Sequence, residues 1–185
     1  MAMRAASELP LLTADDVLEL SFPGKVVELV RGHLVVREPD STRHGIAQAN
    51  LASFLSAFTR AGDLGVVITG SGFKITENPD TVRAPDVAFV PRERAGTIPP
   101  RSYAAFAPIL LAEIVSPNDR PGEVLAKVAD WLDAGARLVW VVDPQRDVAQ
   151  VYRAEGSVSF VASDGSLEGE DVLPGFRVAL RDILA

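Results

Sequence analysis

The chain has 185 residues, of which 48% are hydrophobic and 23% are charged, and its formal net charge at pH 7 is −7. This length is enough for one domain with a sizeable core, and the composition is that of an ordinary globular protein. The absence of cysteine excludes disulfides and thiolate metal sites. No stretch approaches the ~18 consecutive apolar residues of a membrane-spanning helix, and the first ten residues lack the apolar run of a signal peptide. We therefore expect a cytoplasmic protein with a single domain over residues 1–185, of which residues 1–12 are flexible.

The N-terminal half predicts two helices and five short strands. Thr13 and the acids that follow it indicate a short first helix. A longer helix is expected from about 42 to 60, where apolar residues form a broad stripe, namely Ile46, Ala49, Leu51, Phe54, Leu55 and Phe58. Short apolar runs between turn residues predict strands at 26–30, 34–37, 66–69, 73–76 and 87–90. The third and fourth of these strands would be joined by a tight turn or a bulge at 70–72.

The C-terminal half is organised around a buried strand. The run from Ile109 to Val115 is apolar at every position except Glu113, as in a strand that is buried on both faces. A helix is expected from about 120 to 134, and a second apolar strand follows at 138–142. Because these elements form a βαβ unit, the two strands should be parallel with a right-handed crossover. Further strands at 148–153 and 158–162 predict an antiparallel extension, and a last helical turn is expected at 180–184.

Two carboxylates begin or interrupt buried strands. Glu113 lies among aliphatic residues, where an unpaired carboxylate is costly or is forced to protonate, so we expect a cation beside it. Asp86 stands at the start of the 87–90 strand, and the two carboxylates can converge if their strands are neighbours in the sheet. Oxygen ligands on rigid strands suit Mg²⁺ or Mn²⁺. Asp86 by itself would also fit a turn residue that is fixed by Pro85.

Lys127 and His44 are further candidates. Lys127 lies at the border of the apolar face of its helix, from where it could reach over the end of the Glu113 strand and stabilise charge on a phosphate. The alternative is a surface side chain that pairs with Glu123. His44 fits either a capping or packing residue or a group near the substrate. Two histidines and no cysteine disfavour a zinc site.

Several arginines surround these candidates, and some of them belong to the long irregular segment 91–108. They are either a solvated surface or contacts to a phosphate backbone, for which arginine is well suited. A loop of this length is often functional. The arginines are Arg83, Arg92, Arg94, Arg101 and Arg120.

The arrangement of Asp86, the strand that carries Glu113 and the helix that carries Lys127 resembles the PD-(D/E)XK nuclease superfamily. The lysine of that motif usually lies two residues after the acid, which is Val115 here, so Lys127 would supply it from the following helix. The chain is also similar to the Uma-type restriction endonuclease family over about residues 13–184. The similarity rests on residues 28–32, 44–45, 85–90, 113–117 and 140–144, and on Lys127, Trp131 and Gly135.

The resemblance implies an α/β fold with a restriction-endonuclease-like core (αβββαβ), a mixed central sheet, flanking helices and an antiparallel extension. It implies a Mg-dependent endodeoxyribonuclease in which Asp86, Glu113 and Lys127 hydrolyse phosphodiester bonds of DNA and the two acids hold Mg²⁺ or Mn²⁺. It also indicates Glu28 as an additional metal ligand, directly or through water, and the alternative is an ordinary edge-strand acid. By analogy with the superfamily we expect a homodimer.

Two residues depart from the usual family pattern, His33 in place of an acid and Trp131 in place of a tyrosine. Neither is expected to touch the three proposed catalytic residues. A catalytically silent module that binds DNA or a protein is the alternative function, which the acidic net charge favours and the intact set of site residues disfavours. Hydrolysis of a nucleotide or another small phosphate lacks a glycine-rich phosphate loop to support it.

Overall fold

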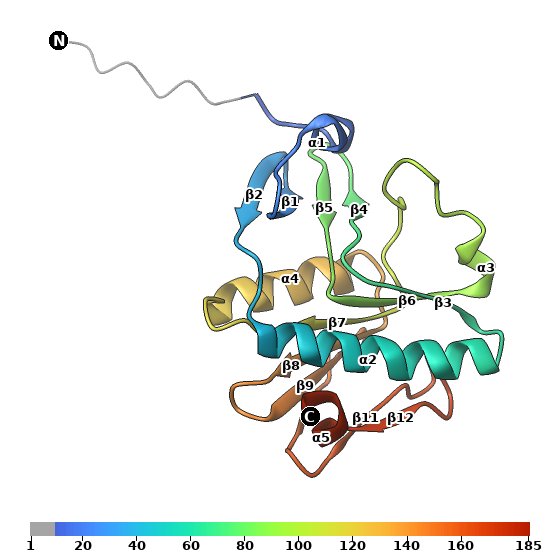
Figure 1. The fold of residues 1–185 in the computed structure, drawn as a ribbon. Coiled ribbons are helices and arrows are strands. Elements are labelled where there is room, and N and C mark those ends of the chain that lie inside the picture. The colour runs from blue at the N-terminus through green and yellow to red at the C-terminus, as the bar shows by residue number, and fades with distance from the viewer. Residues whose placement is uncertain (1–9) are drawn as a thin grey trace.

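The computed structural model describes residues 10–185 (Figure 1). The helices are α1 (Ala14–Glu19), α2 (Thr42–Ala61), α3 (Arg92–Ala95), α4 (Pro121–Asp133) and α5 (Leu180–Leu184). The strands are β1 (Val26–Val30), β2 (His33–Arg37), β3 (Gly65–Ile68), β4 (Phe73–Thr76), β5 (Thr81–Arg83), β6 (Val87–Pro91), β7 (Leu110–Ile114), β8 (Leu138–Asp143), β9 (Val148–Arg153), β10 (Val158–Val161), β11 (Ser166–Glu168) and β12 (Arg177–Ala179). None of the helices in the described range is long and apolar enough to cross a bilayer.

The segment before α1 is attached to the turn between β1 and β2. The backbone N–H of Leu12 donates to the carbonyl of Gly32 over 2.9 Å. Thr13 then caps α1, because its side chain accepts from the backbone N–H of Asp16 and the Asp16 carboxylate accepts from the backbone N–H of Thr13. The flexibility expected at the N-terminus otherwise concerns residues 1–9, which lie outside the described residues.

A six-stranded mixed sheet forms the centre of the molecule, in the order β10-β9-β8-β7-β6-β3. Strands β7 and β8 are parallel, with Glu113 opposite Val141, and the other neighbouring pairs are antiparallel. The succession α2, β3, β6, β7, α4 and β8 is the αβββαβ core that was predicted. Strands β9 and β10 supply the antiparallel extension, so the predicted fold class is confirmed.

The two faces of this sheet carry different layers. Since successive residues of a strand point to opposite faces, Leu110 and Ala112 pack with the α2 side, whereas Leu111 packs with Trp131 of α4. Strands β11 and β12 and helix α5 lie beyond α2, on the far side from β1 and β2 (Figure 1). Glu113 has the same orientation as Leu111, so its side chain lies beneath α4.

A second, four-stranded sheet in the order β2-β1-β5-β4 stands above the core (Figure 1). The predicted link between the third and fourth strands of the N-terminal half is therefore wrong, because β3 pairs with β6 and β4 pairs with β5. The segment 70–72 instead carries the chain from one sheet to the other. Gly70 makes this change of direction possible, since its φ of +62° is in the left-handed region that favours glycine.

The buried face of α2 is narrower than the expected stripe, although Leu51 and Leu55 belong to both. Ile46 and Phe54 are 44% and 41% exposed, whereas Leu51 and Leu55 are fully buried. His44 lies on the same buried face, two to three turns before these leucines, and is 3% exposed. The face that α2 turns toward the sheet therefore begins with a titratable side chain.

Candidate active site

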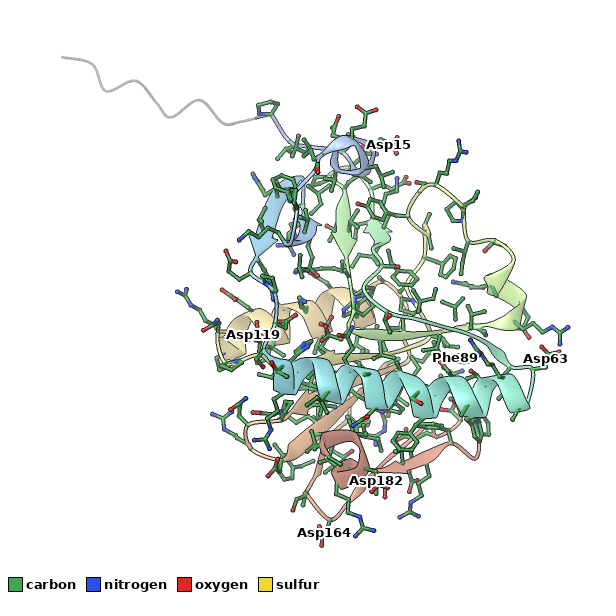
Figure 2. All side chains as sticks on the ribbon, in the orientation of Figure 1. Asp15, Asp63, Phe89, Asp119, Asp164 and Asp182 are labelled. Atoms are coloured by element: carbon green, nitrogen blue, oxygen red, sulfur yellow. The ribbon has the colours of Figure 1, made fainter. Side chains whose placement is uncertain are left out.

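A small pocket opens where the two sheets and the N-terminal ends of α2 and α4 meet. It has a cavity volume of about 40 Å³, enough for a few water molecules. Asp119, labelled in Figure 2 beside the start of α4, lies at its rim. The pocket brings together the three residues that the sequence proposed as catalytic. Its lining consists of Val26, Arg37, Glu38, Asp40, His44, Ala84, Asp86, Glu113, Ile114, Val115, Asp119, Val124 and Lys127.

Glu113 is held by two donors from α4. Its Oε2 lies 3.2 Å from Nζ of Lys127, and its Oε1 accepts from the indole N–H of Trp131 over 2.7 Å. The expectation that Trp131 would not touch the site is therefore wrong. Burial raises the pKa of Glu113 to about 7, although Lys127 acts in the opposite direction. Without a further cation, this carboxyl group takes up a proton near neutral pH.

Lys127 points into the site because of its place on α4. It lies four residues before Trp131, so both side chains project from one face of the helix onto β7. Its Nζ also lies 3.4 Å from Oε1 of Glu28, so the side chain faces two carboxylates of the core rather than Glu123. Burial alone would lower the pKa of Lys127, but Glu113 and Glu28 outweigh it and raise the pKa. The ammonium group therefore stays charged.

Asp86 is fixed by the sheet. Asp86 directly precedes β6, and the antiparallel register pairs Val87 of β6 with Ala112 of β7, so the two acids stand next to paired residues of neighbouring strands as expected. Oδ2 of Asp86 accepts from the backbone N–H of Ile114 over 2.6 Å. Asp86 is thus more than a turn residue, since its carboxylate is oriented toward the pocket that Glu113 lines.

His44 is a site residue whose contacts the sequence did not predict. Its Nε2 lies 3.2 Å from Oδ2 of Asp86 and 3.8 Å from Oδ2 of Asp40, and the three ligand atoms lie within 4.8 Å of one another. Burial would lower the pKa of His44, but Asp86, Asp40 and Asp119 together outweigh it and the pKa is raised. Its Nδ1 has no hydrogen-bond partner within residues 10–185. The signal in the sequence was its spacing of seven residues from Leu51 on the buried face of α2.

Glu28 lies on β1, which is an inner strand between β2 and β5, so the edge-strand alternative is wrong. The residue is 1% exposed and its carboxylate receives donors on both oxygens. Oε1 accepts from the backbone N–H of Ala84 over 3.1 Å and faces Lys127, while Oε2 lies 3.0 Å from Arg83 and 3.8 Å from Arg37. Burial would raise the pKa of Glu28, but these cations together lower it. Its role as a metal ligand stays a prediction.

The arginines that cluster in the sequence separate in space. Arg83 is 5% exposed and bridges Glu28 and Asp130 of α4, with its Nη2 2.6 Å from Oδ2 of Asp130, so it is neither a solvated residue nor a backbone contact. Arg37, which the sequence did not single out, lines the pocket. The remaining members of the cluster are exposed, namely Arg92, Arg94, Arg101 and Arg120.

The pocket thus combines a buried acid on the third core strand, an acid directly before the neighbouring strand and a lysine from the following helix. A solved structure from Anabaena variabilis, described as "a putative nuclease belonging to DUF820", has the same fold, with a TM-score of 0.79 and 18% sequence identity over 94% of this chain and 97% of that one. No curated protein matches the sequence.

Residues 14–181 match the family Uma2, described as "Putative restriction endonuclease". The chain belongs to this family, which confirms the resemblance seen in the sequence.

Proposed function

We propose that this protein is a divalent-metal-dependent endonuclease that hydrolyses phosphodiester bonds of DNA. The observation that carries the proposal is the 3.2 Å contact between Lys127 and Glu113, in a pocket that Asp86 also lines. A cation site and a fixed ammonium group side by side are what the attack of water on a phosphodiester requires. Membership of the restriction endonuclease family supports the same reading.

The ligand set fits a hard divalent cation. Asp86 and Glu113 would hold Mg²⁺ or Mn²⁺ through carboxylate oxygens, which these ions prefer. Asp40 and His44 add an oxygen and a nitrogen beside Asp86, and a nitrogen ligand favours Mn²⁺ over Mg²⁺. When bound, such a cation lowers the pKa of a water molecule and polarises the phosphate.

The protein groups would share the remaining work. The Lys127 ammonium would stabilise negative charge that develops on the phosphate. Arg37 lines the same pocket with a side chain that is 29% exposed, and its guanidinium would bind a non-bridging phosphate oxygen. The backbone N–H of Ile114 holds Asp86 in the orientation that a ligand needs.

The acidic net charge of −7 supports one other function, a catalytically silent module of nuclease fold. Such a module would bind DNA or a protein without needing the cation. The homodimer and the cytoplasmic location also remain predictions, since they rest on analogy with the superfamily and on composition.

The deciding experiment pairs calorimetric titration of Mn²⁺ with a plasmid-nicking assay. We expect the wild type to bind Mn²⁺ and nick the plasmid, Glu113→Gln to do neither, and Lys127→Ala to bind Mn²⁺ but nick at least about 10²-fold more slowly. Glu170→Gln is the matched control, because Glu170 pairs with Arg153 and is not part of the pocket lining. A wild type that binds no Mn²⁺ and leaves the plasmid intact would favour the silent module.

A further inference from the structure

The ammonium of Lys127 lies between two carboxylates that differ in their surroundings. Glu113 lines the pocket, whereas Glu28 is 1% exposed and lies behind the lysine, outside the pocket lining. The two Nζ–O distances are similar, 3.2 Å and 3.4 Å. We propose that Glu28 is a positioning residue that holds Lys127 in its working place, and this inference rests on the proposed nuclease function.

The donors around Glu28 argue for this role and against a metal ligand. A carboxylate offers about four lone-pair sites. Glu28 already faces the backbone N–H of Ala84, the ammonium of Lys127 and the guanidinium groups of Arg83 and Arg37. A cation could reach it only by displacing one of these donors, at a position that is closed to solvent.

Glu113 cannot hold the lysine alone. Once Glu113 serves as a ligand, its charge is shared with the cation, which also repels the ammonium group of Lys127. Glu28 is then the carboxylate that keeps Lys127 beside the phosphate. Its burial makes it effective, because few water molecules screen the attraction.

A second contact fixes Glu28 relative to the helix that carries the lysine. Arg83 on β5 binds Oε2 of Glu28 with one nitrogen and Oδ2 of Asp130 with two others, over 2.6 to 3.0 Å. Asp130 lies one turn after Lys127 on α4. Glu28, Arg83 and Asp130 therefore form a brace of ion pairs between the four-stranded sheet and α4, in which Glu28 and Arg83 are buried and Asp130 is partly exposed. Through this brace, the second sheet would support a lysine that comes from a helix instead of from β7.

The first test is a double-mutant cycle on plasmid cleavage with Mn²⁺, using Glu28→Gln, Lys127→Ala and the two together. We expect Glu28→Gln to lower kcat by about 10²-fold, the cost typical of a misplaced catalytic group, and to leave KM and the Mn²⁺ Kd unchanged. In the Lys127→Ala background it should have no further effect, because Glu28 acts through the lysine. Loss of Mn²⁺ binding, or effects that multiply in the double variant, would overturn the inference.

A second test needs no cleavage. The chain has three lysines, Lys25, Lys74 and Lys127, so amine-reactive labelling read by mass spectrometry has two internal references. In Glu28→Gln we expect labelling of Lys127 to rise about tenfold relative to the others, since one of its two charged partners is lost. Protection that stays at the wild-type level would overturn the inference even for a protein that cuts no DNA. Failure of the wild type to cut DNA with Mn²⁺ would instead count against the proposed function.

Two further variants guard against simple misfolding. Glu28→Asp keeps the charge of the brace but places it one methylene further from the lysine, and we expect it to give labelling and kcat between those of the wild type and Glu28→Gln. Glu170→Gln makes the same chemical change at an ion pair outside the pocket lining and should match the wild type in both tests. A Glu28→Asp variant that labels like the wild type but has lost Mn²⁺ binding would assign Glu28 to the metal instead.

Discussion

Replacing Glu113 by glutamine should make the protein more stable at alkaline pH when divalent cations are absent. Burial raises the pKa of this carboxyl from an ordinary value of 4.5 to about 7. At 1.36 kcal/mol for each pKa unit, a difference of about 2.5 units corresponds to roughly 3 kcal/mol. This is the free energy by which ionised Glu113 destabilises the folded state, even with Lys127 and Trp131 beside it.

The sign of the effect follows from the number of protons bound. Between about pH 4.5 and 7 the unfolded chain has released the proton of Glu113, whereas the folded chain still holds it. The free energy of unfolding of the wild type therefore falls as the pH rises through this window and the loss is complete above it. Glutamine does not titrate, so Glu113→Gln lacks the fall. His44 titrates in both proteins and cancels in the comparison.

Urea unfolding at a series of pH values from 4 to about 8, in the presence of a chelator, measures this difference. We expect the advantage of Glu113→Gln over the wild type to be about 3 kcal/mol larger at the alkaline end than at pH 4. Glu170→Gln provides the control for an unrelated glutamate. Stability curves of the wild type and Glu113→Gln that run parallel across the window would refute the reasoning from burial. Saturating Mn²⁺ should reverse the order at the alkaline end, because it stabilises only the protein that binds it.

Two further variants and one pH series test other parts of the site. Trp131→Phe keeps most of the ring packing but leaves Oε1 of Glu113 without its donor, and we expect urea unfolding to show a loss of about 1–3 kcal/mol. A loss of only a few tenths would mean that the indole N–H contributes little. Arg83→Met leaves Glu28 and Asp130 without their shared partner, so we expect a loss of about 3–5 kcal/mol in the same assay. Unchanged stability would show that the brace is not needed for folding. The Mn²⁺ affinity of the wild type, measured by calorimetry, should fall about tenfold for each pH unit below 7, because Glu113 must lose its proton before it can act as a ligand. An affinity that is constant between pH 5 and 7 would remove Glu113 from the ligand set.

The central sheet could be predicted because its strands are visible in the local sequence as apolar runs. The apolar run around Glu113 and the run at 138–142 are long enough, and the helix between them is regular enough, to fix a parallel pair. The same logic predicted that Lys127 could reach Glu113. Trp131 could have been found in the same way, since it lies four residues after Lys127 on one face of the helix.

The second sheet could not be predicted from local patterns. Strand β5 has only three residues, too few to show a period, and in the sheet it lies between β4, which directly precedes it in the chain, and β1, which lies far before it. Without β5, Arg83 reads as one more surface arginine and Glu28 as an edge-strand acid. Their ion pair joins residues 55 positions apart, and such a contact is specified by tertiary packing rather than by neighbouring residues.

The same geometry fits the role that we propose for Lys127, in which a helix supplies the lysine that the superfamily motif usually places on a strand. Val115, two residues after Glu113 and directly after the end of β7, packs with the cluster on the α4 side of the sheet, and it lines the same pocket as Lys127. Helix α4 packs over the face of the sheet to which Val115 points. A lysine at the border of the apolar face of α4 therefore reaches the space that a lysine at position 115 would fill. A lysine on the strand is positioned by the backbone that it shares with the acid. A lysine side chain that extends from a helix instead needs a carboxylate partner to position its ammonium group. Glu28 is that partner, and the position of the four-stranded sheet against the core places Glu28 beside Lys127.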